Sequence, residues 1–193
     1  MSGEKRLQTP LSDQDVEGLR VGDKVLLSGT LLTARDAAHK RLVERIDEGE
    51  DLPVDLKGQV MYFVGPTPPK PGEVIGSAGP TTSSRMDKYS PKLMALGLKG
   101  MIGKGWRGPQ VVEAMKNFRC VYFAAIGGAG ALLSRSIKSS EVVAYGDLGT
   151  EAIRRLGVEE FPVLVANDVY GNDLFQMGKE AYARKGDERK SSA

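Results

Sequence analysis

Cysteine and histidine are nearly absent from this sequence. Among its 193 residues, Cys120 is the only cysteine and His39 is the only histidine. A lone cysteine cannot form an internal disulfide, and alone it cannot hold a zinc ion or an iron–sulfur cluster. A single histidine likewise excludes a multi-histidine metal site within the chain. Any metal chemistry must therefore come from another chain.

Long apolar runs and an excess of one charge are missing as well. No run approaches the ~20 apolar residues that a membrane helix needs, and the first residues contain no apolar signal stretch. We therefore expect a cytoplasmic protein that does not contact a membrane. The 27 basic and 25 acidic residues leave a formal charge of +2, too balanced to argue for nucleic acid. The length suits one full-sized domain with a sizeable core.

Strand and helix signals alternate along the chain. A turn at residues 22–23 leads into an apolar strand ending near residue 34, and a helix over 36–48 follows, with Asp36 as its cap. Further strands are expected at 58–64, 74–78, 99–103, 120–126, 137–145 and 161–166. Further helices are expected from Arg85 to about 97, over 109–117 and over 150–156, with a turn or helix at 127–133. This alternation predicts an α/β fold with a mixed sheet.

Residues 76–87 carry the strongest functional signal in the chain. They read Gly-Ser-Ala-Gly-Pro-Thr-Thr-Ser-Ser-Arg-Met-Asp. The run Thr81-Thr-Ser-Ser84 stands where the next helix is predicted to begin, and hydroxyl side chains cap helix N-termini well. Arg85 in a first turn would oppose the positive end of the helix dipole. Free N–H groups, hydroxyls and an arginine together predict a receptor for an anion.

Two further cations follow predicted strands. Lys104 lies between two glycines just after the strand at 99–103, where open α/β sheets usually bind ligands, although a surface lysine in a tight turn is an equal alternative. Arg35 could present its guanidinium fork to a carboxylate, but the residues alone favour a salt bridge with Asp36 or a neighbour. His39 stays outside the catalytic set because a lone helical histidine is more often structural.

The candidate anion contacts therefore come from three loops. They are Arg35, Thr81, Thr82, Arg85 and Lys104. Three converging cations would suit a small ligand with two carboxylates. From the residues alone, we expect a carboxylate- or phosphate-binding α/β domain that could form half of an active site.

Several other features are weaker. The turn Gly127-Gly-Ala-Gly130 resembles phosphate-binding glycine turns, but close packing of a helix on a sheet explains it equally well. Glu141, Asp147 and Glu151 could act as acids or bases, and Glu151 would also suit a helix N-terminus. Trp106 could edge a pocket or an interface. Asn167-Asp168 is predicted to form a turn.

Five motifs in one order resemble a known family. They are Gly79-Pro-Thr-Thr-Ser-Ser-Arg-Met-Asp87, Met101-Ile-Gly-Lys-Gly105, Gly127-Gly-Ala-Gly-Ala131, Glu141-Val-Val-Ala-Tyr-Gly-Asp-Leu-Gly-Thr-Glu-Ala-Ile153 and Phe161-Pro-Val-Leu-Val-Ala-Asn-Asp168. From about residue 19 to 176, the chain resembles the β subunit of class I fumarate hydratase, equivalent to the C-terminal domain of the single-chain enzymes. L-tartrate dehydratase β subunits share the pattern.

This resemblance implies a swivelling β/β/α domain at residues 19–178, between an N-terminal arm at 1–18 and a polar tail at 179–193. It also implies a partner α subunit whose three cysteines hold a four-iron, four-sulfur cluster, with no cofactor bound by this chain. The implied reaction is the reversible hydration of fumarate to (S)-malate, active only with the partner, as in the tricarboxylic acid cycle. The implied assembly is an αβ heterotetramer, and an isolated homodimer would be compatible with it.

The resemblance also implies roles for particular residues. Arg35 and Arg85 match carboxylate-binding arginines, Lys104 matches a substrate-contacting lysine, and Thr81 matches the proposed base that removes the C3 proton of malate. Ser84 stands where many relatives have glycine, a departure that could alter the turn. Tartrate dehydratase is the alternative within the same class, and a non-catalytic carboxylate- or phosphate-binding module is the alternative from another class.

Overall fold

Within residues 4–125 and 130–191, which the computed structural model describes, seven strands form one mixed sheet. The strands are β1 (Lys5–Gln8), β2 (Lys24–Thr33), β3 (Val60–Tyr62), β4 (Gly100–Gly103), β5 (Val121–Ala124), β6 (Ile137–Ala144) and β7 (Ile153–Asn167). Their order across the sheet is β1-β2-β3-β4-β5-β7-β6, and β2 also pairs with β7. The predicted α/β class with a mixed sheet is confirmed.

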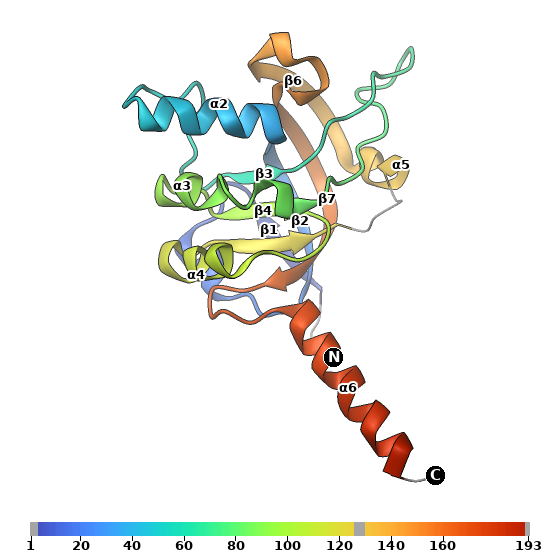
Figure 1. Cartoon of the computed structure of the whole chain (residues 1–193). Coiled ribbons are helices and arrows are strands. Elements are labelled where there is room, and N and C mark those ends of the chain that lie inside the picture. The colour runs from blue at the N-terminus through green and yellow to red at the C-terminus, as the bar shows by residue number, and fades with distance from the viewer. Residues whose placement is uncertain (1–3, 126–129, 192–193) are drawn as a thin grey trace.

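Helices connect most of these strands. The α-helices are α1 (Asp13–Glu17), α2 (Asp36–Asp47), α3 (Ser90–Ala95), α4 (Pro109–Phe118), α5 (Gly130–Leu133) and α6 (Leu174–Ser191), and the short 3-10 helices are η1 (Ser83–Met86), η2 (Ser134–Ser136) and η3 (Gly146–Glu151). Figure 1 shows α2, α3 and α4 along one side of the sheet, while α6 points away from it. In the described part of the chain, no helix has the length and apolar character needed to cross a bilayer.

The sheet closes on itself through β7. The strands β2, β3, β4 and β5 pair in parallel, with Leu32 of β2 opposite Met61 of β3. The 15-residue β7 runs antiparallel to both β5 and β2, and Phe161 lies opposite Leu27 of β2. Strands β2, β3, β4, β5 and β7 therefore form a closed ring, while β1 extends β2 and β6 extends β7.

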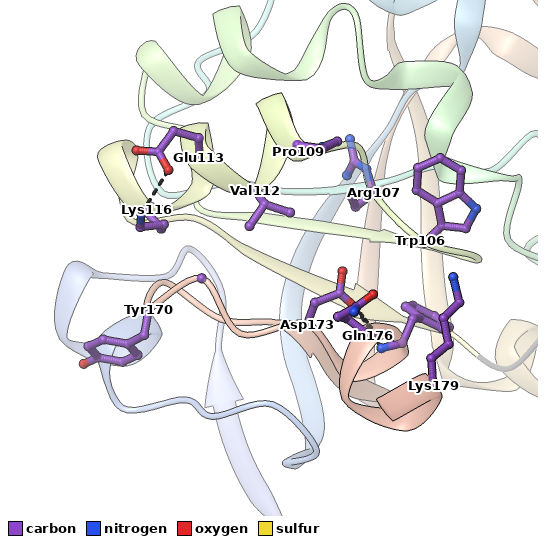
Figure 2. Close-up of a pocket in the computed structure, with 12 residues that line it drawn as sticks. Trp106, Arg107, Pro109, Val112, Glu113, Lys116, Tyr170, Asp173, Gln176 and Lys179 are labelled. Carbon is purple, nitrogen blue, oxygen red and sulfur yellow. Dashed lines mark hydrogen bonds and ion pairs between the residues drawn. The ribbon is translucent and has the colours of Figure 1, made fainter. Parts of the chain in front are cut away.

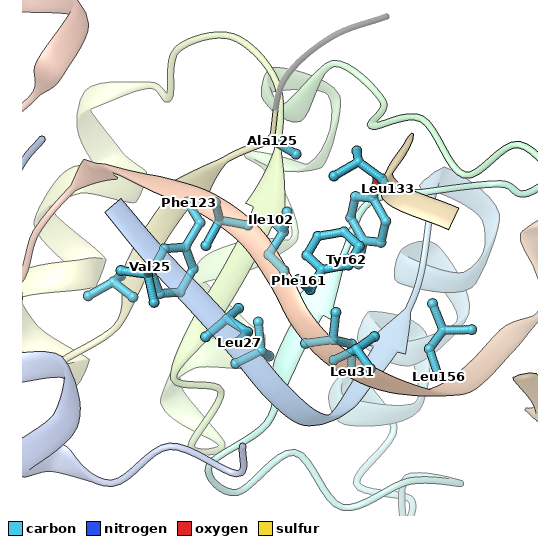
Figure 3. Close-up of a cluster of buried hydrophobic side chains, with 14 of the residues drawn as sticks. Val25, Leu27, Leu31, Tyr62, Ile102, Phe123, Ala125, Leu133, Leu156 and Phe161 are labelled. Carbon is cyan, nitrogen blue, oxygen red and sulfur yellow. The ribbon is translucent and has the colours of Figure 1, made fainter. Parts of the chain in front are cut away.

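Apolar side chains fill both faces of this ring. One buried cluster lies inside it, where the rings of Tyr62 and Phe161 meet edge to face with their centroids 5.3 Å apart (Figure 3). A second cluster lies between the ring and the helices, and includes Met61, Phe63 and Met115. Successive residues of a strand point to opposite faces, so the buried run Met61-Tyr62-Phe63 serves both clusters. Strands buried on two faces are expected of parallel pairing with helices outside.

Most predicted elements are present, including the strand that ends at Thr33, α2 and α4. Two predictions are wrong. Residues 74–78 form irregular structure rather than a strand, and residues 153–156 belong to β7 rather than to a helix. Ile153 packs in the outer cluster and Leu156 in the inner one. An apolar pair three residues apart fits one helix face, but it fits a strand buried on both sides equally well.

The two ends of the chain take regular structure where they are described. Residues 5–8, within the predicted N-terminal arm, form β1, and Ser12 caps α1 in a reciprocal capping box with Asp15. Residues 179–191 of the predicted tail continue α6. The polar composition of the N-terminal end is compatible with β1 because this strand alternates between half-buried and exposed residues.

Candidate active site

Parallel strands deliver two of the predicted site residues to one edge of the sheet. Strand β2 ends at Thr33, two residues before Arg35, and β4 ends at Gly103, immediately before Lys104. Strand β3 lies between them and pairs in parallel with both. The carboxyl ends of parallel strands meet at the same edge, which is where open α/β sheets bind ligands. Arg35 and Lys104 therefore belong to one edge.

The turn that carries Thr81 and Arg85 is fastened to this edge by backbone hydrogen bonds. The Thr81 N–H donates to the Phe63 carbonyl, just after β3, at 2.7 Å. The Lys104 N–H donates to the Thr81 carbonyl at 3.2 Å, and the Ser83 N–H donates to the Lys104 carbonyl at 2.9 Å. The turn thus extends the sheet between the ends of β3 and β4. The four predicted residues lie at one edge, and their chemical roles remain predictions.

The expected α-helix does not begin at the hydroxyl run. Residues Ser83–Met86 form the short η1 turn, without a side-chain cap from Thr82, and α3 begins only at Ser90. The Ser83 hydroxyl is buried and lies 2.8 Å from the Tyr122 hydroxyl instead of capping a helix. The prediction of an anion site at a helix N-terminus is therefore wrong in its geometry.

Arg85 is paired with the first residue of α2. Its Nε lies 3.0 Å from Asp36 Oδ1, and its second guanidinium nitrogen lies 2.8 Å from Asp36 Oδ2. Asp36 was predicted to cap α2, but the N-cap position belongs to Arg35, whose side chain makes no cap. Because Asp36 directly follows Arg35, the pair brings the Arg85 turn beside the Arg35 loop. Half of the Arg85 side chain is exposed, so it remains accessible to a ligand.

Arg35 forms an ion pair with Glu151, which lies in the connection between β6 and β7. Its guanidinium lies 3.6 Å from Glu151 Oε1, while Glu151 Oε2 accepts the Ala37 N–H at 2.8 Å. Glu151 thus sits at a helix N-terminus as its charge suggested, but the helix is α2. A Cβ on Gly65 would lie 2.6 Å from the Arg35 guanidinium, so a side chain at this position would make the arginine shift. Arg35 Nε is buried and has no hydrogen-bond partner among the described residues.

Gly130, the first residue of α5, packs against the stretch that leads to Thr81. The Ala78 N–H donates to the Gly130 carbonyl at 3.3 Å, and a Cβ on Gly130 would lie 2.9 Å from the Gly79 nitrogen. Close packing therefore explains Gly130. The rest of the predicted glycine motif, residues 127–129, lies outside the described residues.

A buried arginine that sequence reasoning missed lies beneath the site. Arg107 Nε is 2.7 Å from Asp87 Oδ1, and another of its nitrogens donates to Ser90 Oγ at 2.8 Å. Asp87 Oδ2 also accepts the Gly108 N–H at 2.7 Å. The Arg107 side chain is fully buried and lies over the rings of Phe63 and Tyr122. This pair anchors the end of the site turn to the segment after Lys104, and no motif in the sequence marks it.

His39 is structural, as expected for a lone histidine. It is fully buried beside Phe63, with its Nδ1 2.9 Å from the Arg35 carbonyl. A carbonyl oxygen only accepts, so Nδ1 carries the proton, while the buried Nε2 has no partner among the described residues. Burial lowers the pKa of His39 to about 4. The neutral ring supports the loop that presents Arg35.

This histidine predicts a loss of stability in weak acid. An unfolded histidine titrates near pH ~6.5, so between that pH and about 4 the unfolded chain binds a proton that the folded chain does not. The free energy of unfolding should therefore decrease as the pH is lowered through this window, by up to ~3 kcal/mol from this group. Urea unfolding of the chain and of His39→Gln from pH 7.5 to 4.5 measures it. The Gln variant should show a flatter pH dependence, and parallel curves would contradict the assignment.

A cavity lined by described residues lies beside the site rather than in it. It has a volume of about 490 Å³ and lies between α4 and the start of α6 (Figure 2). Trp106 edges it, as the sequence suggested, together with Tyr170 and Phe175. None of Arg35, Thr81, Arg85 and Lys104 lines it. Arg85 and Lys104 are exposed and Arg35 and Thr81 are partly exposed, so the edge that they share is open to solvent.

The remaining candidate acids are engaged in other contacts. Asp147 forms a two-pronged pair with Arg41 of α2, and Arg41 lowers the pKa of Asp147. Glu141 lies 3.6 Å from Arg155 on the exposed hairpin of β6 and β7. Asp168 is buried and accepts hydrogen bonds within the turn that precedes α6, as predicted for Asn167-Asp168.

The side chains do not fit a resident iron–sulfur cluster. Cys120 is buried, and burial raises the pKa of its thiol to about 12, which disfavours the thiolate that a cluster needs. Among the described residues, no group of three histidine, cysteine, aspartate or glutamate side chains is arranged to hold a metal ion. A cluster that takes part in chemistry at this edge would need ligands from a partner.

The fold and the site define a mixed α/β domain with three cationic side chains at one sheet edge. The family model described as Fumarase C-terminus matches residues 3–178. The chain therefore belongs to the fumarase C-terminus family.

Similar proteins fall into two groups. The chain is 44% identical over 159 residues to "Fumarate hydratase class I, aerobic" of Escherichia coli strain K12, a match that covers 81% of this chain and 29% of the relative. It is 34% identical over 188 residues to "L(+)-tartrate dehydratase subunit beta" of the same strain, a match that covers 95% of this chain and 92% of the relative. It is 37% identical to "Putative L(+)-tartrate dehydratase subunit beta" of Methanocaldococcus jannaschii, covering 90% and 93%. The chain thus spans less than a third of the fumarate hydratases, but nearly all of the separate β subunits, and both groups are hydro-lyases.

Proposed function

We propose that this chain is the β subunit of an iron–sulfur hydro-lyase that interconverts fumarate and (S)-malate. The observation that carries the proposal is the placement of Arg35, Thr81, Arg85 and Lys104 at the edge formed by the ends of β2, β3 and β4. Fumarate carries two carboxylates, and guanidinium groups bind carboxylates through two parallel hydrogen bonds. Two arginines and a lysine supply the charge that such a ligand requires.

In this proposal the side chains divide into clamps and a base. Arg35 and Arg85 bind the carboxylates, and Lys104 makes a further contact with the substrate. Thr81, as its alkoxide, accepts the proton from C3 of malate; the electrons of that C–H bond form the C2=C3 double bond, and the C2–O bond breaks with its electrons on the departing hydroxide. The proton taken by Thr81 then passes to the hydroxide, which leaves as water and restores the alkoxide. An alcohol is a poor base unless nearby charge stabilises its alkoxide. In this proposal Arg85 and Lys104 provide that charge; Arg85 follows Thr81 in the same turn, and the Lys104 backbone bonds to Thr81 across the edge, which supports the assignment.

The partner and the assembly belong to the same proposal. We propose that a separate α subunit holds a four-iron, four-sulfur cluster and supplies the other half of the site. The open edge and the buried, protonated Cys120 support this division. We further propose that the closed sheet with outer helices is a swivelling β/β/α domain, and that αβ pairs associate into a heterotetramer.

A second candidate substrate is L-tartrate. The matches that extend over nearly the whole chain and nearly the whole relative are to tartrate dehydratase β subunits. Tartrate has the same two carboxylates and one more hydroxyl than malate, so the same clamps would serve it. Substrate choice therefore depends on the groups that face the middle of the substrate.

Reconstitution tests the proposal. The purified chain should show no hydratase activity, and activity should develop when it is mixed anaerobically with a cluster-loaded α subunit. Fumarate and L-tartrate supplied together as competing substrates then rank the two hydro-lyase activities. Full activity of the chain alone would overturn the proposal. Measurable fumarate binding without any activity in the mixture would favour a non-catalytic binding module.

Arg85→Ala in the reconstituted enzyme should raise KM for the dicarboxylate by about 10- to 100-fold. The change removes charged hydrogen bonds, each of which contributes roughly 1.5–3 kcal/mol. Arg41→Ala is a matched control, because Arg41 of α2 also pairs with an aspartate, Asp147, through two hydrogen bonds. Steady-state kinetics should show no comparable rise for the control. Equal KM values for both variants would remove Arg85 from the substrate contacts.

A further inference from the structure

A single buried hydroxyl joins the two loops of the site. Tyr122 lies on β5 with its ring in the outer apolar cluster. Its hydroxyl donates to the Gly105 carbonyl at 2.9 Å and lies 2.8 Å from the Ser83 hydroxyl. A phenol has one proton to donate, and Gly105 receives it. Ser83 must therefore donate to Tyr122, which gives an ordered chain of hydrogen bonds from Ser83 through Tyr122 to Gly105.

The two ends of this series of hydrogen bonds lie next to the proposed catalytic groups. Ser83 follows Thr81 by two residues, and Gly105 directly follows Lys104. Two backbone bonds span the same gap: the Lys104 N–H donates to the Thr81 carbonyl, and the Lys104 carbonyl accepts the Ser83 N–H. The phenol and these bonds therefore fix the same separation, that between the Thr81 turn and the Lys104 loop.

The surrounding chain is built to admit this bridge. A Cβ on Gly103 would lie 1.9 Å from Ser83 Oγ, so a side chain there would displace the serine hydroxyl. Burial also raises the pKa of Tyr122 to about 12, which keeps the phenol protonated as a donor. A phenylalanine would fill the same apolar space without the cost of burying a polar group. The hydroxyl therefore calls for a reason beyond packing.

We propose that the Tyr122 hydroxyl is a positioning group that holds Thr81 and Lys104 in the relative placement that catalysis needs. The proposal rests on the proposed hydro-lyase function, because it gives the placement a chemical purpose. Tyr122 does not touch the substrate. It acts through the Ser83 and Gly105 contacts, and a small displacement of reacting groups can cost about 100-fold in rate.

Tyr122→Phe tests the bridge in two ways. In the purified chain, amide hydrogen exchange at Ser83 and Lys104 should become about 5- to 10-fold faster, the loss expected for about one net hydrogen bond. In the enzyme reconstituted with its α subunit, kcat should fall by at least tenfold, while KM changes less, because the arginine clamps are intact. Ser83→Ala should reproduce both effects, and the double variant should show little further loss, since both changes break one chain of bonds.

Thr9→Val is the matched control. The Thr9 hydroxyl is also buried and bridges two backbone groups, since it donates to the Thr30 carbonyl and accepts the Thr30 N–H. Thr30 lies in β2, away from the Thr81 turn and the Lys104 loop. Its loss should lower stability without changing kcat or exchange at Ser83 and Lys104. Unchanged exchange and unchanged kcat in Tyr122→Phe would overturn the proposal. If the unmodified assembly turns over no dicarboxylate, the proposed function fails. The bridge is then still tested by the isolated chain, where unchanged amide exchange at Ser83 and Lys104 in Tyr122→Phe would contradict it.

Discussion

Asp87→Ala is expected to lower the free energy of unfolding by about 3–5 kcal/mol, the range for removing one partner of a buried ion pair. Arg107 is fully buried, and Asp87 is its only carboxylate partner among the described residues. The Gly108 N–H would lose its acceptor as well. Much of the loss comes from the uncompensated charge rather than from the strength of the pair. Equilibrium unfolding in urea measures it.

Two further variants show whether the buried charge is the cause. Adding Arg107→Met to the Asp87→Ala chain removes the stranded guanidinium and should recover part of the stability. Asp147→Ala removes the aspartate of an equally close but exposed pair with Arg41, and should cost far less, because solvent screens exposed pairs. Similar losses for Asp87→Ala and Asp147→Ala would contradict the assignment of the Arg107 pair as the anchor of the site turn.

Thr81→Ala in the reconstituted enzyme should lower kcat by about 100- to 10,000-fold, the usual contribution of a positioned general base. KM should change little, since Arg35, Arg85 and Lys104 still hold the substrate. Progress curves for malate dehydration and fumarate hydration measure both directions. Both should fall together, because one group transfers the same proton in each direction.

The neighbouring threonine supplies the control for this result. Thr82 has the same side chain and is exposed, and it makes no side-chain cap in the turn. Thr82→Ala should therefore leave kcat nearly unchanged, while Thr81→Ser should retain part of the activity because it keeps the hydroxyl. A Thr81→Ala enzyme with an unchanged rate would remove Thr81 from the role of base and leave it as a backbone contact to Lys104.

Much of the fold could be predicted because its signals are local. The apolar run that ends at Thr33, the helix that follows it and the proline at the start of α4 each identify an element without reference to the rest of the chain. The closed ring could not be predicted, because it depends on β2 pairing with β7 far along the sequence. Ile153 and Leu156 were assigned to a helix for the same reason, since only the distant partner strands show which faces they occupy.

The charged candidate residues could be found from the sequence, but the groups that support them could not. Arg35, Arg85 and Lys104 follow predicted strands or stand in a distinctive turn, so sequence alone gathered them. Their supports are two carboxylates and a phenol: Glu151 and Asp87 lie inside recognisable motifs, but neither they nor Tyr122 could be assigned their partners from the sequence. The hydroxyl run predicted a helix cap, but the Ser83 hydroxyl forms a hydrogen bond with the buried phenol of Tyr122 instead. Recognising that partner requires the three-dimensional pairing of β4 with β5.

The closure of the sheet by β7 also bears on how the chain is made. β7 is the last strand in the described part of the chain, and its contacts with β2 span long separations, as where Glu160 bonds to Ser28 132 residues earlier. During synthesis, β2 to β5 leave the ribosome before their closing strand exists. Folding that relies on such distant contacts is slow, and until β7 arrives the nascent chain exposes apolar strand edges that invite aggregation. We therefore expect this topology to make the chain depend on chaperones during synthesis, whatever the stability of the finished domain.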